Sequence, residues 1–304
     1  GVGHLWAING TGRGDISETG AVWHFGDEDF HRTLSTVAIR DGLLYTADLS
    51  GFTYCLDVAT GEPLWDTDYV EDYATSIPPW GATSAPLVDG DRLIAIVGGE
   101  PNALVVAFDK RTGTEVWRSL DVNSDAGYGH PVIYEAGGVR QLIVWHPSAL
   151  TSINPETGAI LWEQPWETAD GVTVATPVRS GNYLLVSQLY RGSLMMRLSP
   201  DRPTARLLWK GSGRGYGPDE TDGLHTMIAT PIIVDDYIYG VGSHGELRGL
   251  DARTGARLWM SPDMTTQAPW STAFMVQHGD RYFVNNDEGD LIIAQLTPDG
   301  YVEL

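Results

Sequence analysis

Short apolar runs separated by Gly, Asp or Asn turns follow one another along the whole chain of 304 residues. Runs of this kind are typical of β-strands joined by tight turns. An amphipathic helix would place apolar residues at a period of about 3.6 over roughly ten or more positions, and no segment has that period with capping residues at its ends. The pattern therefore predicts an all-β protein.

A phrase that ends in Trp recurs along the chain. Trp65, Trp117, Trp162, Trp209 and Trp259 are separated by 52, 45, 47 and 50 residues. Residues 107–117 read Ala-Phe-Asp-Lys-Arg-Thr-Gly-Thr-Glu-Val-Trp, and the same 11-residue spacing recurs at 55–65, 152–162 and 249–259, with degenerate copies at 7–23, 197–209 and 294–304. Self-similarity at a fixed period indicates a repeat architecture.

The recurring phrase predicts a β-hairpin. The Asp or Asn side chain can accept hydrogen bonds from the backbone amides that follow it, and the Gly of Thr-Gly supplies a positive φ. We expect the closing Trp to pack against the neighbouring repeat and to bury a large ring there. The predicted docking residues are Trp23, Trp65, Trp117, Trp162, Trp209, Trp259, Gly61, Gly113, Gly158 and Gly255.

A weaker phrase precedes six of these seven hairpins, as at 36–45 and 84–93, and consists of a short strand, a Gly or Asp turn and another strand. Two hairpins per repeat form a four-stranded antiparallel sheet, the blade of a β-propeller. We expect one domain over residues 1–304, with a half blade at 1–25 and six blades over about 26–304. A seven-bladed propeller is the simplest interpretation, and a truncated eight-bladed parent is the alternative.

The composition of the chain limits the kinds of partner that we expect. The net charge of −21 repels phosphate backbones, so we expect no nucleic acid. No run of about 18 uncharged apolar residues is present, so we expect no membrane-spanning segment. The one cysteine, Cys55, cannot form an intramolecular disulfide. We expect a monomer.

The phrase Ala-x-Asp-x-x-Thr-Gly-x-x-x-Trp, as it stands at 107–117, resembles the tryptophan-docking repeat of PQQ-type quinoprotein propellers over essentially the whole chain. In PQQ-dependent alcohol dehydrogenases the resemblance implies a quinone stacked on a Trp, a Ca²⁺ ion held by acidic and amide oxygens, an Asp base and often a vicinal Cys-Cys disulfide. Here Cys55 stands alone, and no residue matches the metal ligands or the base. No catalytic residue and no metal ligand is assigned.

The chain is more similar to the non-catalytic propellers related to the outer-membrane assembly lipoprotein BamB and to bacterial cell-surface proteins named after it. That resemblance implies a binding or scaffolding role, a protein partner or small ligand at the mouth of the propeller, no cofactor, and a periplasmic, cell-surface or secreted location. The first residues contain no lipobox Cys. A PQQ- and Ca-dependent alcohol or sugar dehydrogenase with a divergent site is the alternative, so enzymatic activity stays open.

Loops that lead into the inner strands of a propeller crowd one mouth, and binding residues are expected there. In this chain those segments are rich in His and aromatic residues. The candidates for binding a ligand or partner are His31, Arg32, Trp80, Tyr128, His130, His225 and Trp270.

Each group of candidates has two interpretations. The three histidines could converge on a metal or an anion, but no carboxylate falls at a ligand spacing. We therefore favour histidines that bond a neighbouring blade's backbone or face a water-filled channel. Trp80 and Trp270 each follow a Pro and could hold a planar ligand between them, or cap the core between blades. The acidic clusters at 27–29 and 219–222 are interpreted as solvated loops, and the Gly-rich segment 211–217 as a flexible connector.

Overall fold

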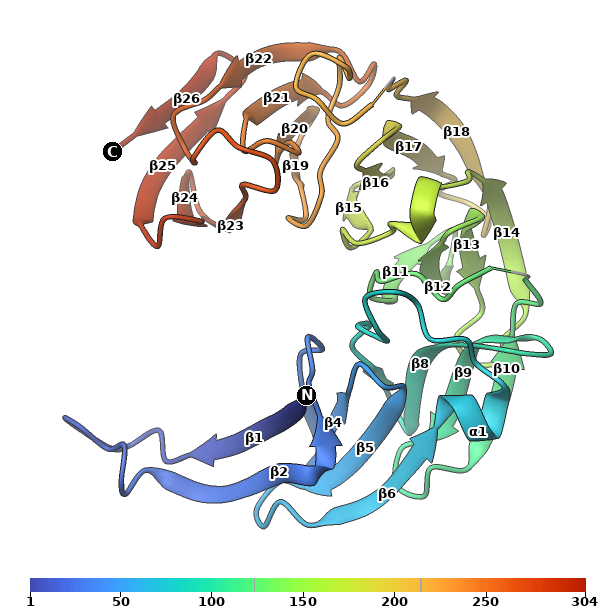
Figure 1. The fold of residues 1–304 in the computed structure, drawn as a ribbon. Helices are drawn as coiled ribbons and strands as arrows, with labels where there is room; N and C mark the ends of the chain where they lie inside the picture. Colours follow the sequence, from blue (N-terminus) through green and yellow to red (C-terminus); the bar gives the residue numbers. More distant parts are fainter. Residues whose placement is uncertain (123, 214) are drawn as a thin grey trace. The chain divides into compact units, whose positions relative to one another are not determined.

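Each repeat in the sequence folds into one antiparallel sheet whose strands follow chain order (Figure 1). The computed structural model describes residues 1–122, 124–213 and 215–304. Within them lie one two-stranded sheet and six four-stranded sheets. This confirms the predicted fold class, a β-propeller of four-stranded antiparallel blades with seven sheets.

The two-stranded sheet comes first and pairs β1 (Val2–Ile8) with β2 (Ala21–His31). The second and third sheets contain β3 (Ala38–Arg40), β4 (Leu43–Ala47), β5 (Phe52–Asp57), β6 (Pro63–Asp68), β7 (Leu87–Asp89), β8 (Arg92–Gly99), β9 (Ala103–Asp109) and β10 (Glu115–Ser119). The fourth and fifth contain β11 (Val132–Ala136), β12 (Val139–His146), β13 (Ala149–Ile153), β14 (Ile160–Pro165), β15 (Val178–Ser180), β16 (Tyr183–Gln188), β17 (Gly192–Leu198) and β18 (Ala205–Lys210). The sixth and seventh contain β19 (Ile232–Val234), β20 (Tyr237–Val241), β21 (Leu247–Asp251), β22 (Arg257–Ser261), β23 (Ala273–His278), β24 (Arg281–Asn286), β25 (Leu291–Thr297) and β26 (Gly300–Glu303).

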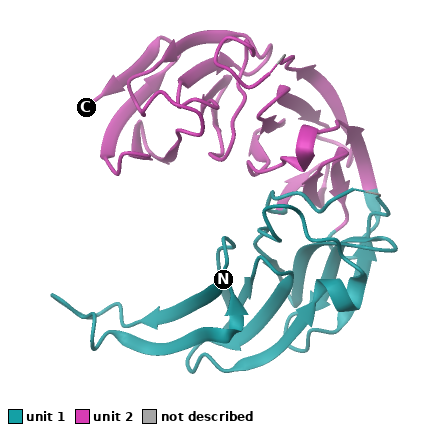
Figure 2. Cartoon of the chain, in the orientation of Figure 1, with its two compact units in different colours: residues 1–131, 155–160 teal, residues 132–154, 161–304 magenta. Residues whose placement is uncertain are grey.

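The chain divides into two compact units, coloured separately in Figure 2. Unit 1 comprises residues 1–131 and 155–160, and unit 2 comprises residues 132–154 and 161–304. In both units the buried apolar side chains lie between consecutive sheets. In unit 1, for example, Tyr45 and Cys55 of one sheet pack against Val106 and Phe108 of the next.

Two short helices interrupt the succession of strands in the described residues. The helix α1 (Tyr69–Tyr73) begins at Asp68, whose carboxylate accepts hydrogen bonds from the amides of Val70 and Glu71, and it buries Tyr69 and Tyr73 against the core. The 3-10 helix η1 covers Ala169–Gly171. Neither helix has the length or the apolar composition needed to cross a membrane.

The Thr-Gly hairpins owe their shape to two short-range interactions. In the β9–β10 turn, Asp109 Oδ1 accepts hydrogen bonds from the amides of Arg111 (3.0 Å) and Thr112 (2.9 Å). Gly113 then takes a φ of +72°, which L-residues rarely adopt. The bonds from Thr112 and Arg111 hold the pKa of the Asp109 carboxyl below its usual range. The same arrangement recurs at Asp57 and Asp251.

The Trp that ends each hairpin lies against the hairpin of the following sheet. Trp117 Nε1–H donates to the carbonyl of Pro155 (3.1 Å), and its ring covers the α-carbon of Gly158 so closely that a Cβ there would lie 2.8 Å from the ring. Equivalent indole bonds join Trp23 to Val58, Trp65 to Lys110, Trp209 to Ala252 and Trp259 to Thr297. Ring contacts of the same kind cover Gly61, Gly113 and Gly255.

Trp162 departs from this arrangement. Its Nε1–H donates to Gln141 Oε1 of its own sheet at 2.7 Å. The following hairpin, residues 199–204, reads Ser-Pro-Asp-Arg-Pro-Thr and lacks the Thr-Gly turn on which the rings of Trp23, Trp65, Trp117 and Trp209 lie. The indole therefore satisfies its donor within its own sheet.

Candidate functional site

Three rings in unit 2 form an exposed stack, here called the aromatic platform: Tyr216, His244 and Trp270. The planes of Tyr216 and His244 are tilted by 11° with centroids 5.7 Å apart, and those of Tyr216 and Trp270 by 13° with centroids 6.0 Å apart. Tyr190 meets Tyr216 edge-on at 6.1 Å. Because Trp270 is 50% exposed and Tyr216 42% exposed, the platform offers π-faces to a ligand.

The platform residues come from the connections of three consecutive sheets. Tyr190 lies in the β16–β17 turn and His244 in the β20–β21 turn. Tyr216 lies in the long loop between β18 and β19, and Trp270 in the loop between β22 and β23. Residues far apart in the sequence thus meet because neighbouring sheets present their connections side by side.

Ser243 holds these loops together beneath the platform. Its side chain is buried, and its Oγ–H donates to the carbonyl oxygen of Tyr216. Its own carbonyl accepts the amide of Trp270 at 3.0 Å. Trp270 has a φ of +74°, a left-handed conformation that is unfavourable for a residue with a large side chain. The fold therefore fixes an exposed Trp in a strained backbone position.

A fully buried ion cluster lies below the platform. Glu246 Oε1 accepts a hydrogen bond from His225 Nε2 (2.8 Å) and pairs with Arg248 Nη2 (2.9 Å), while Glu246 Oε2 accepts the amide of His244 (3.0 Å). Burial acts to raise the pKa of Glu246, but the bond with His225 and the charge of Arg248 outweigh it and hold that pKa below its usual range. Glu246 is therefore a charged anchor for the backbone of a platform residue.

Arg248 joins the same cluster to the loop that carries Tyr216. Its guanidinium donates to the carbonyl oxygens of Pro218 (2.5 Å), Thr221 (2.6 Å) and Gly223 (2.5 Å). The side chain has 0% exposure, so its charge interacts only with groups inside the protein. A buried guanidinium with several acceptors fixes the loop geometry tightly enough to hold a ring in place.

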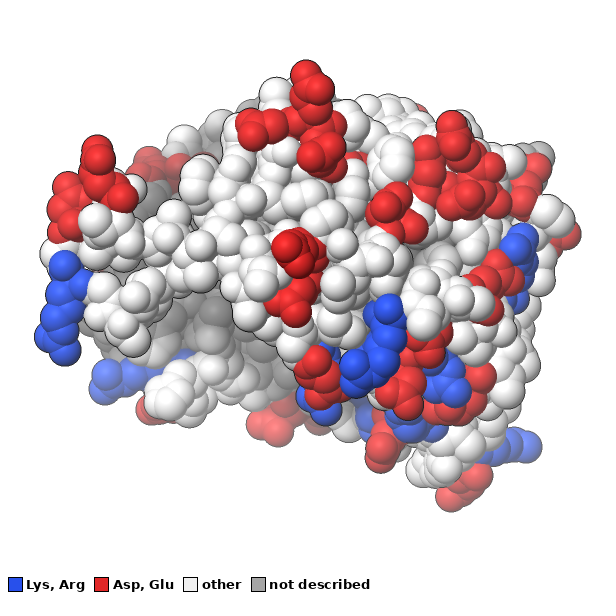
Figure 3. Space-filling model, turned by 90° about the horizontal axis from the view of Figure 1, so that it is seen from below, with Lys and Arg blue, Asp and Glu red and all other residues white. Residues whose placement is uncertain are grey.

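Acidic residues lie in the loop that carries Tyr216 and beside Tyr190. Residues 215–222 contain Asp219, Glu220 and Asp222 and no Lys or Arg, and Glu220 accepts the amide of Gly217 at 2.8 Å. Asp170 hydrogen-bonds the Tyr190 hydroxyl and, after burial, contributes to raising the pKa of that tyrosine. Acidic side chains are also spread over the face drawn in Figure 3, whereas Lys and Arg lie mainly in its lower half.

Five of the predicted site residues, His31, Arg32, Trp80, Tyr128 and His130, lie in unit 1. Trp80 is exposed, and its ring meets that of buried Tyr128 edge-on at 5.6 Å. His130 Nδ1 accepts the amide of Ala85 at 2.8 Å, and burial lowers the pKa of His130. This is the backbone role that the sequence favours for the histidines. Exposed Arg32 contributes its backbone to bonds with Gly1 and Leu49.

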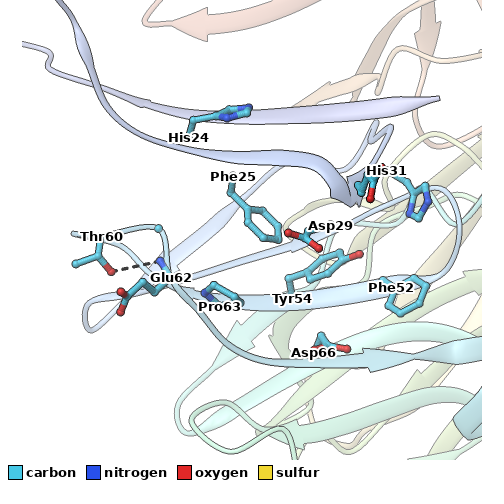
Figure 4. Close-up of a pocket in the computed structure, with 12 residues that line it drawn as sticks. His24, Phe25, Asp29, His31, Phe52, Tyr54, Thr60, Glu62, Pro63 and Asp66 are labelled. Atoms are coloured by element: carbon cyan, nitrogen blue, oxygen red, sulfur yellow. Dashed lines mark hydrogen bonds between the residues drawn. The ribbon is translucent and has the colours of Figure 1, made fainter.

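His31 lies at the rim of a pocket of about 610 Å³ in unit 1 (Figure 4). The rings of Phe25 and Tyr54 meet edge-on inside it, with centroids 5.5 Å apart. His31 Nδ1 lies 3.3 Å from Asp48 Oδ2, and that buried carboxylate also accepts the Tyr54 hydroxyl. The carboxylates that line the pocket are Glu28, Asp29, Glu62 and Asp66.

The structure places His31 in a strand and not in the loop that the sequence predicts. The sequence puts it in a loop that leads into an inner strand, after a half blade that ends at residue 25. In the structure β2 continues to His31, so His31 is the last residue of an outer strand. The strand extends because Asp27 pairs with Gly3 and, after a bulge over residues 28–30, His31 pairs with Val2 of β1.

The predicted site residues fall into separate groups. His31, Arg32, Trp80, Tyr128 and His130 belong to unit 1, and His225 and Trp270 belong to unit 2. Convergence of the three histidines stays a prediction. In unit 2 the structure brings His225 and Trp270 to one place, with His225 buried beneath the surface that Trp270 exposes. No group of three or more His, Cys, Asp and Glu side chains in the described residues is arranged to hold a metal ion.

Sequence reasoning missed Tyr216, Ser243, His244, Glu246 and Arg248. Tyr216 lies in the Gly-rich segment 211–217, which was expected to be a flexible connector; residue 214 of that segment lies outside the described residues. The available signal was an aromatic residue inside a Gly-rich loop, together with the charged pair Glu246 and Arg248 at the start of an apolar strand.

The family model for outer membrane protein assembly factor BamB matches residues 14–259 and 149–299, which together cover most of the chain. The chain belongs to the BamB family. Its tryptophan-docked sheets are thus members of the PQQ-like repeat class that the Thr-Gly hairpins predicted. The likeness to the non-catalytic branch, rather than to the dehydrogenases, is confirmed by the relatives that follow.

Among the most similar relatives is the BamB of Yersinia pestis, 27% identical over 273 residues, which make up 86% of this chain and 63% of that protein. The BamB of Shewanella oneidensis is 24% identical over 95% of this chain and 72% of its own length. The chain therefore spans about two thirds of the length of these curated relatives. Among solved structures, BamB from Moraxella catarrhalis shares the fold with a TM-score of 0.62 and 17% identity over 93% of this chain and 87% of that one.

Quinoproteins are more distant, partial relatives of this BamB-family chain. The quinoprotein ethanol dehydrogenase of Pseudomonas aeruginosa is 28% identical over 158 residues, which cover 47% of this chain and 25% of that protein. One element implied by that resemblance, the vicinal Cys-Cys disulfide, does not fit here. Cys55 is the one cysteine in the sequence, and it is buried in the core.

Proposed function

We propose that this chain is a non-catalytic recognition and scaffolding propeller of the bacterial envelope, acting in outer membrane protein assembly. The names of its relatives call them outer membrane protein assembly factors. The observation that carries the proposal is the aromatic platform, whose rings are held by Ser243 and by a buried ion cluster. A surface that is both apolar and rigid binds a partner at low entropic cost.

In this proposal the platform of Tyr216, His244 and Trp270 is the principal contact surface. Trp80, with Tyr128 beneath it, offers a second exposed aromatic in unit 1. The chain acts as one domain and as a monomer, in the periplasm or at the cell surface, and needs neither PQQ nor Ca²⁺. Arg32, His31 and His130 shape unit 1, and His225 supports the platform from inside unit 2.

The test is site-specific photocrosslinking in the source bacterium. A photoreactive amino acid replaces Trp270 in one strain and Leu258 in the control strain, because Leu258 is exposed on the outer strand β22 of the same unit. We expect position 270 to crosslink an envelope protein that functions in outer membrane assembly, and position 258 to crosslink none. Identical products at both positions, or none at 270, would overturn the proposal.

The dehydrogenase alternative is tested in parallel. The purified chain is titrated with PQQ, with and without Ca²⁺, and dye reduction is followed with simple alcohols and sugars. We expect neither saturable binding nor turnover. Micromolar binding with turnover would make the chain a quinoprotein and would contradict the non-catalytic role.

A further inference from the structure

We propose that the aromatic platform recognises an arginine side chain in an extended peptide segment of the partner. This inference rests on the proposed function and names the chemistry of the group bound at the same site. Three features of unit 2 support it. They are the flat ring faces, the acidic residues near them, and the buried Arg248, whose charge is compensated by Glu246.

The first feature is ring geometry. Trp270, Tyr216 and His244 lie in nearly parallel planes, with neighbouring centroids 5.7 and 6.0 Å apart. Parallel planes at these separations are offset, so each ring keeps part of its face uncovered. A guanidinium is planar and weakly hydrated, and it stacks on Trp and Tyr faces more readily than an ammonium does.

The second feature is charge. Asp219, Glu220 and Asp222 follow Tyr216 in the chain, and Asp170 bonds Tyr190 at the platform edge. The basic residues nearest to these tyrosines in the sequence are Arg214 and Arg191, so acidic residues outnumber basic ones here. Exposed carboxylates accept paired N–H bonds from a guanidinium. The chain as a whole carries a net charge of −21, so its field attracts a cationic segment.

The third feature is the state of Arg248. This residue lies beneath the platform, but its charge faces Glu246 at 2.9 Å. Its Nη1 and Nη2 groups donate to the carbonyls of residues 218, 221 and 223. It therefore orders the acidic loop without competing for a ligand. Arg248 has 0% exposure, and Glu246 compensates its charge. The buried guanidinium therefore does not repel an incoming cation.

The strained backbone at Trp270 makes it possible to remove the ring with a variant that should still fold. The residue has a φ of +74° and is half exposed, so Trp270→Gly relieves the backbone and removes the ring. Trp270→Phe keeps an aromatic face. Trp80→Ala removes an exposed Trp of similar accessibility in unit 1 and serves as the matched control.

The experiment is a titration of the full chain with fluorescein-labelled peptides in about 150 mM salt, followed by anisotropy. The probes are Gly-Arg-Gly-Arg-Gly, its Lys counterpart and its neutral citrulline counterpart, all with amidated ends, together with maltotetraose as an unlabelled competitor. We expect the Arg peptide to bind at least about 5-fold more tightly than the Lys peptide and at least about 10-fold more tightly than the citrulline peptide.

The variants locate the site. We expect Trp270→Gly to weaken Arg-peptide binding at least about 10-fold, Trp270→Phe to retain most of it, and Trp80→Ala to change it less than about 2-fold. Equal affinity for the Arg and Lys peptides would show attraction by the acidic field alone and would overturn the proposal. Equal losses for Trp270→Gly and Trp80→Ala, or displacement by maltotetraose, would also overturn it.

Failure of this inference differs from failure of the proposed function. If position 270 crosslinks an assembly protein but the Arg peptide is not preferred, the surface binds its partner through other chemistry. If the Arg peptide binds at the platform but position 270 crosslinks no envelope protein, arginine recognition stands and the assembly role fails.

Discussion

Trp117 and Gly158 touch across the junction of two successive sheets, with the indole ring lying where a side chain at residue 158 would begin. The contact is repeated between Trp23 and Gly61, Trp65 and Gly113, and Trp209 and Gly255. One hairpin glycine thus performs two tasks. It adopts the left-handed conformation of the turn and leaves space for the ring from the preceding sheet.

Because Gly158 has both roles, an added methyl group should destabilise the protein in two ways. Gly158→Ala should lower the free energy of unfolding by about 1–2 kcal/mol through the left-handed φ and by about 1–3 kcal/mol more through the clash with Trp117. Gly90→Ala is the matched control, because its φ is +59° and nothing lies within 4 Å of its Cβ position. Urea unfolding measures both. Equal losses would show that the ring contact contributes nothing.

Removal of a docking ring should be among the most destabilising substitutions in the chain. Trp117 is 8% exposed, so Trp117→Ala leaves a large cavity and should cost about 3–5 kcal/mol. Trp80→Ala, at a site 57% exposed, should cost less than about 1 kcal/mol. Thermal and urea unfolding of the two variants make the comparison. An unchanged melting temperature for Trp117→Ala contradicts the docking role.

The buried ion cluster should be far more important for stability than an exposed pair of Arg with a carboxylate. Arg248→Met removes one partner of Glu246 and the donor to three buried carbonyl groups, and should cost about 3–5 kcal/mol. Arg253→Met, which breaks an exposed pair with Asp251, should leave the free energy of unfolding almost unchanged. Urea unfolding tests the difference. Near-ultraviolet circular dichroism should also change for Arg248→Met, because the platform rings lose their support.

The buried His146 makes the free energy of unfolding depend on pH. Burial lowers its pKa to about 4, so the folded protein keeps this imidazole neutral while the unfolded chain takes up a proton near pH 6.5. The contribution is fully present above about pH 6.5 and is lost as the pH falls towards about 4. The loss amounts to about 2–3 kcal/mol at about pH 4.5. Urea unfolding at about pH 7.5 and about pH 4.5 measures it.

The control for this acid dependence is the variant that removes the buried imidazole. His146→Gln should reduce the difference in the free energy of unfolding between the two pH values by about 2–3 kcal/mol. Carboxylates titrate in the wild type and in the variant and cancel in the comparison. An unchanged pH dependence in His146→Gln would mean that His146 titrates in the folded state as it does in the unfolded chain.

Local patterns predicted most of the fold. The Asp-x-x-Thr-Gly turns form because Asp109 bonds the next amides and Gly113 accepts a positive φ, and both interactions lie within a few residues. Because such hairpins recur at a regular spacing, the four-stranded sheets and the Trp positions followed from the sequence. Trp162 was the exception, since its partner depends on the turn of the next repeat, which is degenerate.

The candidate site was predicted only in part. Trp270 and His225 were named, but their roles differ, one as an exposed ring and the other as a buried support for Glu246. The end of β2 was placed too early, because pairing with β1 and not local residue preference carries that strand to His31.

By itself, the sequence determined the all-β class, the hairpins, the period of the sheets and the acidic field, because these follow from short-range hydrogen bonding, periodicity and summed charge. The aromatic platform was decided only by tertiary structure. Tyr216, His244 and Trp270 lie on separate connections, and they meet because Ser243, Glu246 and Arg248 bond backbone groups from different loops. Interactions between residues so distant in the chain leave no local pattern, so only the packed sheets bring them together.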